Sequence, residues 1–252
     1  MTDGVHELSM LIGGADAILI VTGAGVSTET GIPDFRGPQG VWNTQRPVMY
    51  QDFLTSEADR VTYWNQKVLA AETIEVAKPG AVHKACVVLE NAGKLEAIVT
   101  QNIDGLHTIA KSSEERVVEV HGTGREAVCL TCKGRSPIVP HLKAFTDTGV
   151  PPRCHCGGLL KPATISFGQQ LDPKTMAQAT QAAEACDLVI AMGTTLSVYP
   201  AAEIPLIAAR RGVPYVIINQ GDTEHDGMPY ITLRIEAPVG PTFSQAVTQA
   251  LT

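Results

Sequence analysis

Residues 17–36 read AILIVTGAGVSTETGIPDFR, and this stretch decides the fold that we expect for the chain. A short apolar run ends in a glycine-rich turn, as it does where a strand covered on both faces leaves a parallel sheet. Further apolar runs that end in polar or glycine-rich turns lie at residues 97–101, 117–120, 188–192 and 215–219, with a weaker candidate at 231–235. These runs predict the strands of one parallel sheet.

Helix-like stretches lie between the runs, at residues 57–76, 82–91, 173–185, 201–211 and 242–251. This alternation predicts an α/β fold with a Rossmann-like, doubly wound parallel sheet. In such a sheet, ligands bind beyond the carboxyl ends of the strands. The residues at the carboxyl ends of the predicted strands include Gly23, Asn102, His121, Gly193 and Asn219, so we expect them to share one site.

Composition narrows the possible classes of protein. The chain has 252 residues, a net charge of −7 and 44% hydrophobic residues, which suits one large domain or one large and one small. The negative charge argues against a nucleic-acid partner. The first ten residues lack the features of a signal peptide, and no apolar run reaches the length of a membrane span. We therefore expect a cytoplasmic protein with no membrane partner, and the oligomeric state stays open.

Four of the six cysteines form two pairs, CLTC at residues 129–132 and CHC at residues 154–156. Two such pairs predict a tetrahedral zinc site, which is structural because four protein ligands leave no position for water. The second pair is one residue short, so His155, and less strongly His141, are alternative ligands. The expected zinc ligands are Cys129, Cys132, Cys154 and Cys156.

The segment around these cysteines, from residue 129 to about residue 166, has no long apolar period and is rich in proline and glycine. We therefore expect an inserted, loop-rich module that the metal, rather than a core, stabilises.

The turn after the first predicted strand suits a phosphate group, because glycines let the backbone and a following helix N-terminus approach it. The full dinucleotide fingerprint G-x-G-x-x-G is not met, since Thr28 takes the place of the third glycine, and this argues against a dehydrogenase. Each motif also has a plainer interpretation: a tight turn for residues 23–25 and 102–105, and a hydrogen-bonded loop residue for His121.

Taken together, the sequence blocks resemble the sirtuins, with a bacterial-like pattern. The blocks are GAGVSTETGIPDFRG (23–37), TQNIDGLH (100–107), HG (121–122), the cysteine pairs, FG (167–168), MGTTLSV (192–198) and INQGDT (218–223), in that family's order. The resemblance implies one catalytic domain with two lobes. The large Rossmann-like lobe would comprise about residues 1–34, 78–124 and 171–252, and the smaller zinc-binding lobe the insertions at about 35–77 and 125–170.

The resemblance also implies an activity, the NAD-dependent removal of acyl groups from protein lysines. The products would be nicotinamide, O-acyl-ADP-ribose and free lysine, and the partners acyl-lysine proteins. His121 would be the general base, supported by Asn102 and Asp104, and Ile165, Phe167 and Gly168 would contact substrate. The implied NAD-binding residues are Gly23, Ala24, Gly25, Ser27, Asp34, Phe35, Arg36, Gln101, Asn102, Ile103, Asp104, Gly193, Thr194, Thr195, Ser197, Asn219, Gln220, Asp222 and Val239.

The sequence departs from relatives that prefer acidic acyl groups. Those relatives carry a Tyr-x-x-Arg pair, whereas residues 63–67 read YWNQK, so an uncharged acyl group such as acetyl is expected. A variant pair made by Trp64 and Lys67 stays open, as does plain helix packing for Tyr63 and Trp64. Two other functions also stay open: a mono-ADP-ribosyltransferase or NAD glycohydrolase on the same fold, and a non-catalytic NAD-binding module.

Overall fold

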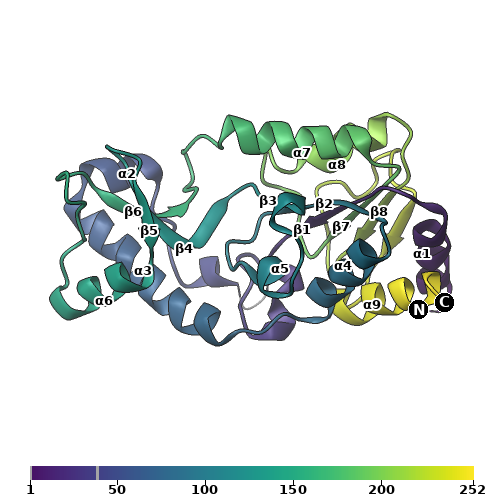
Figure 1. Cartoon of the computed structure of the whole chain (residues 1–252), viewed down its shortest axis with the longest axis horizontal. Helices are drawn as coiled ribbons and strands as arrows, with labels where there is room; N and C mark the ends of the chain where they lie inside the picture. The colour runs from purple at the N-terminus through teal and green to yellow at the C-terminus, as the bar shows by residue number, and fades with distance from the viewer. Residues whose placement is uncertain (1, 38–39) are drawn as a thin grey trace.

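The computed structural model describes residues 2–37 and 40–252, and a six-stranded parallel sheet lies in its large lobe (Figure 1). The strand order is β3-β2-β1-β7-β8-β9, and every pairing is parallel. The order reverses between β1 and β7, which is where an open α/β sheet forms a ligand crevice. The strands are β1 (Ile18–Thr22), β2 (Leu95–Thr100), β3 (Val117–Glu119), β7 (Leu188–Met192), β8 (Tyr215–Ile218) and β9 (Leu233–Ile235).

Helices cover both faces of this sheet, as the predicted doubly wound fold requires. One face packs against α1 (Thr2–Gly14), α4 (Ala81–Asn91) and α9 (Val239–Ala250), and the other against α7 (Pro173–Ala185) and α8 (Glu203–Arg210). Alternate residues of β1 enter the two cores: Ile18 and Ile20 enter one, and Leu19 and Val21 the other. The continuous apolar run of β1 is therefore explained by burial on both sides.

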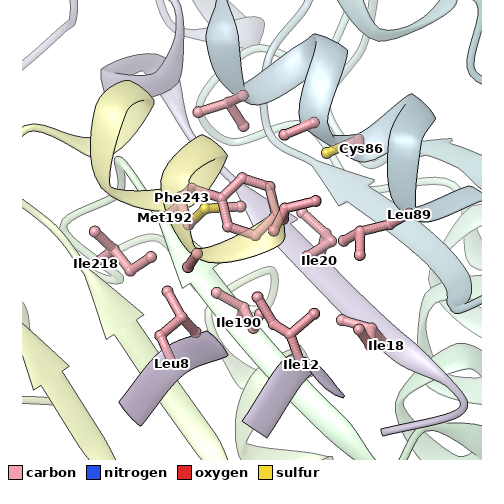
Figure 2. Close-up of a cluster of buried hydrophobic side chains, with 14 of the residues drawn as sticks. Leu8, Ile12, Ile18, Ile20, Cys86, Leu89, Ile190, Met192, Ile218 and Phe243 are labelled. Carbon is pink, nitrogen blue, oxygen red and sulfur yellow. The ribbon is translucent and has the colours of Figure 1, made fainter. Parts of the chain in front are cut away.

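The core beneath α1 and α9 is shown in Figure 2. Leu8 and Ile12 of α1 point toward Ile20 and Ile190 of the sheet, and the ring of Phe243 from α9 lies among them. These side chains are fully buried, and each contributes about 1.5–3 kcal/mol through burial alone. The sequence analysis does not predict a helix over residues 2–14, yet α1 supplies one side of this core.

The small lobe has a sheet and a core of its own. The antiparallel order is β5-β4-β6, and Phe53, Trp64, Phe145 and Leu160 pack beside it. Its elements are α2 (Tyr50–Thr55), α3 (Glu57–Val76), α6 (Val139–Thr148), β4 (Gly122–Cys129), β5 (Arg135–Pro137) and β6 (Leu160–Thr164).

The expectation of a coreless, loop-rich insert at residues 129–166 was wrong. The ten-residue helix α6 and two strands lie there, and the apolar side chains that cover them come largely from α2 and α3. Because those helices precede the insert by many residues, the local apolar pattern of the insert did not reveal a core.

Short elements complete the chain. They are α5 (Leu106–Ile109) and 3₁₀ turns at Ala24–Val26, Thr28–Thr30, Val41–Asn43 and Glu114–Arg116. Across the described ranges, none of the helices combines the length and apolar character that a membrane crossing requires. Helix α9 begins at Val239, earlier than expected, because Pro241 falls in its first turn, where a missing N–H costs nothing.

Replacing Leu8 tests the placement of α1. Leu8→Ala should lower the free energy of unfolding by about 2–5 kcal/mol, because the cavity forms in a packed core. Met10→Ala on the same helix is the matched control: Met10 is 65% exposed, so its loss should change stability by less than about 0.5 kcal/mol. Chemical denaturation followed by circular dichroism measures both, and equal losses would contradict this packing.

Candidate active site

A cavity of about 850 Å³ lies at the carboxyl ends of the central strands and extends to the small lobe. It is lined by the turns after β1, β2, β7 and β8, by segment 34–37 and by the residues after β6. Every residue expected to contact NAD or substrate lines it, apart from Ser27, Asp104 and Ser197. The structure thus brings together side chains that lie more than 200 residues apart in the sequence, such as Ala24 and Val239.

Those three side chains lie immediately behind the wall. The hydroxyl of Ser27 donates to Oδ2 of Asp104 at 2.8 Å, and both residues are buried. Ser197 Oγ lies 2.8 Å from the hydroxyl of Thr195, which lines the cavity. Ser27 and Ser197 thus contact residues that line the cavity, Asn102 and Thr195, rather than the cavity itself.

The glycine-rich turn after β1 is shaped by a second turn rather than by a helix. The N–H of Gly25 donates to the carbonyl of Gly193 at 2.8 Å. A Cβ on Gly25 would lie 2.7 Å from Cα of Gly193, so no other residue fits there. The chain then forms two 3₁₀ turns, and the expected helix N-terminus after Gly25 is absent from the described structure.

His121 lies where the chain passes from the large sheet to the small one, between β3 and β4. Its Nδ1 is 3.1 Å from the backbone carbonyl oxygen of Gln101. Because a carbonyl oxygen only accepts, Nδ1 carries the proton and Nε2 of the neutral ring is the acceptor. Burial lowers the pKa of His121 from 6.5, Arg36 lowers it further, and the bond to Gln101 opposes both.

Asn102 is held by three hydrogen bonds. Its backbone N–H donates to Thr100 Oγ1 at 3.0 Å, and its Nδ2 donates to the carbonyl of Gly23 at 3.1 Å and to Ser27 Oγ at 3.2 Å. These bonds join the turn after β2 to the turn after β1. The Asn102 amide is therefore fixed in one orientation before any ligand arrives.

Aromatic rings cover one side of the cavity. The rings of Phe35 and Trp42 stack with centroids 5.2 Å apart, and Trp42 lies 6.2 Å from the ring of Phe167. The backbone N–H of Tyr50 donates to the carbonyl of Phe167 at 2.9 Å, which attaches this segment to α2. The three rings therefore form a continuous aromatic wall on this side of the cavity.

The small-lobe end of the cavity is lined by Tyr63, Gln66 and Lys67 of α3. Tyr63 Oη lies 2.9 Å from Thr164 Oγ1. Burial, the largest effect, raises the pKa of Tyr63, but the ammonium groups of Lys67 and Lys161 and two hydroxyl bonds lower it to about 7. The two ammonium groups and the hydroxyl bonds thus favour the ionised phenol more than burial disfavours it.

Trp64 has a different place. It is fully buried in the small-lobe core, with its ring centroid 6.1 Å from that of Phe145. Trp64 therefore packs helix α3 against the core and does not line the cavity, so Trp64 and Lys67 cannot together contact an acyl group. Tyr63, by contrast, lines the cavity.

The four expected zinc ligands meet at one point of the small lobe. Their Sγ atoms all lie within 4.8 Å of one another, with 3.5 Å between Cys129 and Cys156 and 3.7 Å between Cys132 and Cys154. Tetrahedral zinc with bonds of about 2.3 Å separates its sulfurs by about 3.8 Å. The donor set therefore fits structural zinc, and the C-x-C pair supplies both of its thiols.

The alternative histidine ligands are not needed. His155 Nδ1 lies 3.5 Å from the thiol of Cys154, outside the four-sulfur cluster, and His141 Nε2 lies 2.8 Å from Ser136 Oγ.

Comparison with known proteins decides the family. Residues 23–200 match the family model described as "Sir2 family". The chain is a member of the Sir2 family. NAD-dependent protein deacetylase 1 of Bradyrhizobium diazoefficiens is 40% identical to it over 243 residues, which cover 96% of each chain. NAD-dependent protein deacetylase 1 of Pyrobaculum aerophilum is 39% identical over 226 residues, 89% of this chain and 87% of that one.

Solved Sir2 structures share the fold over nearly the whole chain. A Sir2–p53 peptide–NAD⁺ complex has a TM-score of 0.86 and 33% identity, and covers 96% of each chain. A Sir2 variant with a deacetylated p53 peptide and 3′-O-acetyl ADP-ribose has a TM-score of 0.88 and 32% identity over 96% of each chain. The predicted Sir2 family and α/β architecture are confirmed.

Sequence reasoning missed part of the cavity wall. Trp42, Met176, Val198, Tyr199 and Pro200 all line the cavity. Val198 ends the MGTTLSV block and Tyr199 and Pro200 follow it directly, so counting the last residue of that Sir2 motif and the next two would have found them. Trp42 and Met176 carried no comparable signal, because an isolated aromatic or methionine is more often a core residue.

Removing one thiol tests the zinc site. Cys132→Ser should weaken zinc binding by at least about a hundredfold and destabilise the small lobe, because metal affinity is part of its folding free energy. His155→Ala should keep one zinc per chain, since the cluster already has four sulfurs. Metal analysis of the purified proteins gives both results, and metal loss in His155→Ala would contradict the assignment.

Proposed function

We propose that the cavity removes acyl groups, acetyl first, from protein lysines with NAD as the co-substrate, and that His121 is the general base. One observation carries this proposal: Gln101 fixes the proton of the His121 ring on Nδ1, which leaves Nε2 as a proton acceptor in a cavity large enough for two substrates. The chain is a Sir2 enzyme, an NAD-dependent protein deacetylase like its relatives.

NAD would bind at the carboxyl ends of β1 and β7, where the strand order reverses. The turns of residues 23–25 and 193–195 offer backbone N–H groups and hydroxyls to the pyrophosphate, and Asn219, Gln220 and Asp222 line the end suited to the adenosine. Val239 closes that end. NAD supplies the electrophilic ribose carbon, and the protein's task is to orient it and to keep water away.

The nicotinamide half would lie near His121. Asn102, fixed by Thr100, Gly23 and Ser27, would orient a ribose hydroxyl, while Asp104 and Ser27 stabilise that arrangement from behind. The stacked Phe35 and Trp42 would shield the site from solvent. Asp34, Arg36 and Ile103 would complete the wall around the ribose.

The acyl-lysine would enter from the small-lobe side. Ile165, Phe167 and Gly168 line that edge and follow β6, so a peptide chain would lie along them. The acyl group would point toward His121, with Tyr63 and Gln66 beside it. We propose that the two lobes, about residues 1–34, 78–124 and 171–252 against 35–77 and 125–170, hold the two substrates between them.

His121→Asn separates the base from the hydrogen bond that orients it. An asparagine Nδ2 can still donate to the Gln101 carbonyl but cannot take a proton, so kcat should fall by about 10²–10⁴-fold with NAD binding retained. The assay is mass spectrometry of acetyl-, butyryl- and succinyl-lysine peptides with NAD. Unchanged turnover would remove His121 from this role, and NAD cleavage that needs no acyl peptide would favour a glycohydrolase.

The pH profile gives a second test of His121. The base must be neutral, so kcat/KM should rise as the pH rises through the pKa of the imidazole, and the midpoint should lie below 6.5 because burial lowers that pKa. Arg36→Gln should move the midpoint to higher pH, since a cation that disfavours the protonated ring is lost. A midpoint above 6.5 in the unaltered enzyme would contradict the environment described for His121.

A further inference from the structure

Two buried histidines behind the site are left without a role by the proposed function. His83 on α4 and His107 on α5 are 0% and 2% exposed, and their ring centroids lie 4.6 Å apart. Among the described residues, His83 Nε2 and His107 Nδ1 are buried ring nitrogens without a hydrogen-bond partner. A buried polar atom left unpaired is costly, so two neighbouring ones call for an explanation.

The bonds that the rings do make determine their tautomers. The N–H of Gly80 donates to His83 Nδ1 at 3.1 Å, so that nitrogen is bare and the proton of a neutral ring lies on Nε2. The hydroxyl of Thr22 donates to Thr100 Oγ1 at 2.9 Å and has no second hydrogen. Its contact of 3.2 Å with His107 Nε2 is therefore one that Thr22 accepts, so His107 Nε2 is protonated and Nδ1 is bare.

Their surroundings favour the neutral form of both rings. Burial and, to a smaller extent, the neighbouring His83 together lower the pKa of His107 to about 3. Burial also lowers the pKa of His83, outweighing Asp104 and Glu29, which raise it. The two unpaired atoms are consequently one donor, on His83, and one acceptor, on His107.

We infer that His83 Nε2–H donates to His107 Nδ1, directly or through one buried water, and that this bond completes a relay that positions Asn102. The relay runs from the start of α4 through His83, His107, Thr22 and Thr100, each donating to the next. It ends at Thr100 Oγ1, which also accepts the backbone N–H of Asn102 at 3.0 Å. His83 and His107 are thus positioning residues, and their effect on NAD rests on the proposed function.

A relay of this kind links the cavity to the packing of two helices. Bonds that point in one direction polarise one another, so each is strengthened by the next. An interruption between the two rings leaves the flanking bonds formed but lets the His107 ring tilt. The Thr22 and Thr100 hydroxyls can then shift with it, and Thr100 Oγ1 is the acceptor that sets the position of the Asn102 backbone N–H. Loss of the bond should therefore weaken NAD binding as well as lower the stability of the fold.

Two variants remove the proposed bond between His83 and His107, and each keeps the hydrogen bond that its residue makes on the other side. His83→Asn retains an acceptor for Gly80, and His107→Gln retains a donor for Thr22. Each should weaken NAD binding, measured by calorimetry, by roughly tenfold. The double variant should be little worse than either single one, because both remove the same bond. His6→Asn, an exposed histidine on α1, is the control and should bind NAD normally.

The same variants separate positioning from stability. Thermal unfolding reports the structural effect, and the calorimetric affinity of the folded protein reports the effect on the site. Lower stability with unchanged NAD affinity, or additive losses in the double variant, would overturn the relay.

Nitrogen-15 NMR of histidine-labelled unaltered protein tests the bond without requiring activity. Both rings should show the Nε2–H tautomer and should not titrate between about pH 6 and pH 8. A titrating ring, or a proton on His107 Nδ1, would overturn the inference even if the variants fail to fold. If the unaltered protein does not bind NAD, the proposed function fails, while the NMR result still decides whether the imidazole bond exists.

Discussion

The site depends on the contact between two turns, one after β1 and the other after β7. Their backbones approach so closely that Gly25 cannot carry a side chain, and Gly193 has a φ of +60°, which favours glycine. This contact lies at the reversal of strand order, where the helices after the strands diverge to opposite faces of the sheet. The open crevice and its lining of backbone groups both follow from it.

The contact also changes the explanation of the glycine-rich motif. The sequence pattern predicts that Gly23 and Gly25 allow a phosphate and a helix N-terminus to approach the turn. In the structure, the second turn of protein backbone already requires a glycine at position 25, whether or not a ligand is present. The motif therefore predicted the position of the site correctly while its physical cause lay 168 residues further along the chain.

Sequence patterns predicted the large sheet well because each strand is buried on both faces and reads as a continuous apolar run. The run at residues 188–192 has the bounds of β7, and the helices at 57–76 and 173–185 have the bounds of α3 and α7. The four-cysteine cluster was predicted equally well, since metal ligands are recognised by residue type and spacing. The sequence did not predict β4 and β6, because the side chains that pack on them come from helices distant in the chain. It did not predict Trp42 as a cavity residue, because its ring contacts with Phe35 and Phe167 form only in the folded chain.

The position of His121 between the two sheets has a mechanical consequence. The residue follows β3 at the edge of the large sheet and precedes β4, the first strand of the small one, and its own carbonyl accepts the N–H of Ile165 at 2.8 Å. The preceding residue, Val120, donates its N–H to the carbonyl of Thr100 at 3.0 Å, in the large sheet. The backbone that carries the imidazole is thus anchored to both sheets at once, so the ring is supported by two rigid frameworks rather than by a free loop.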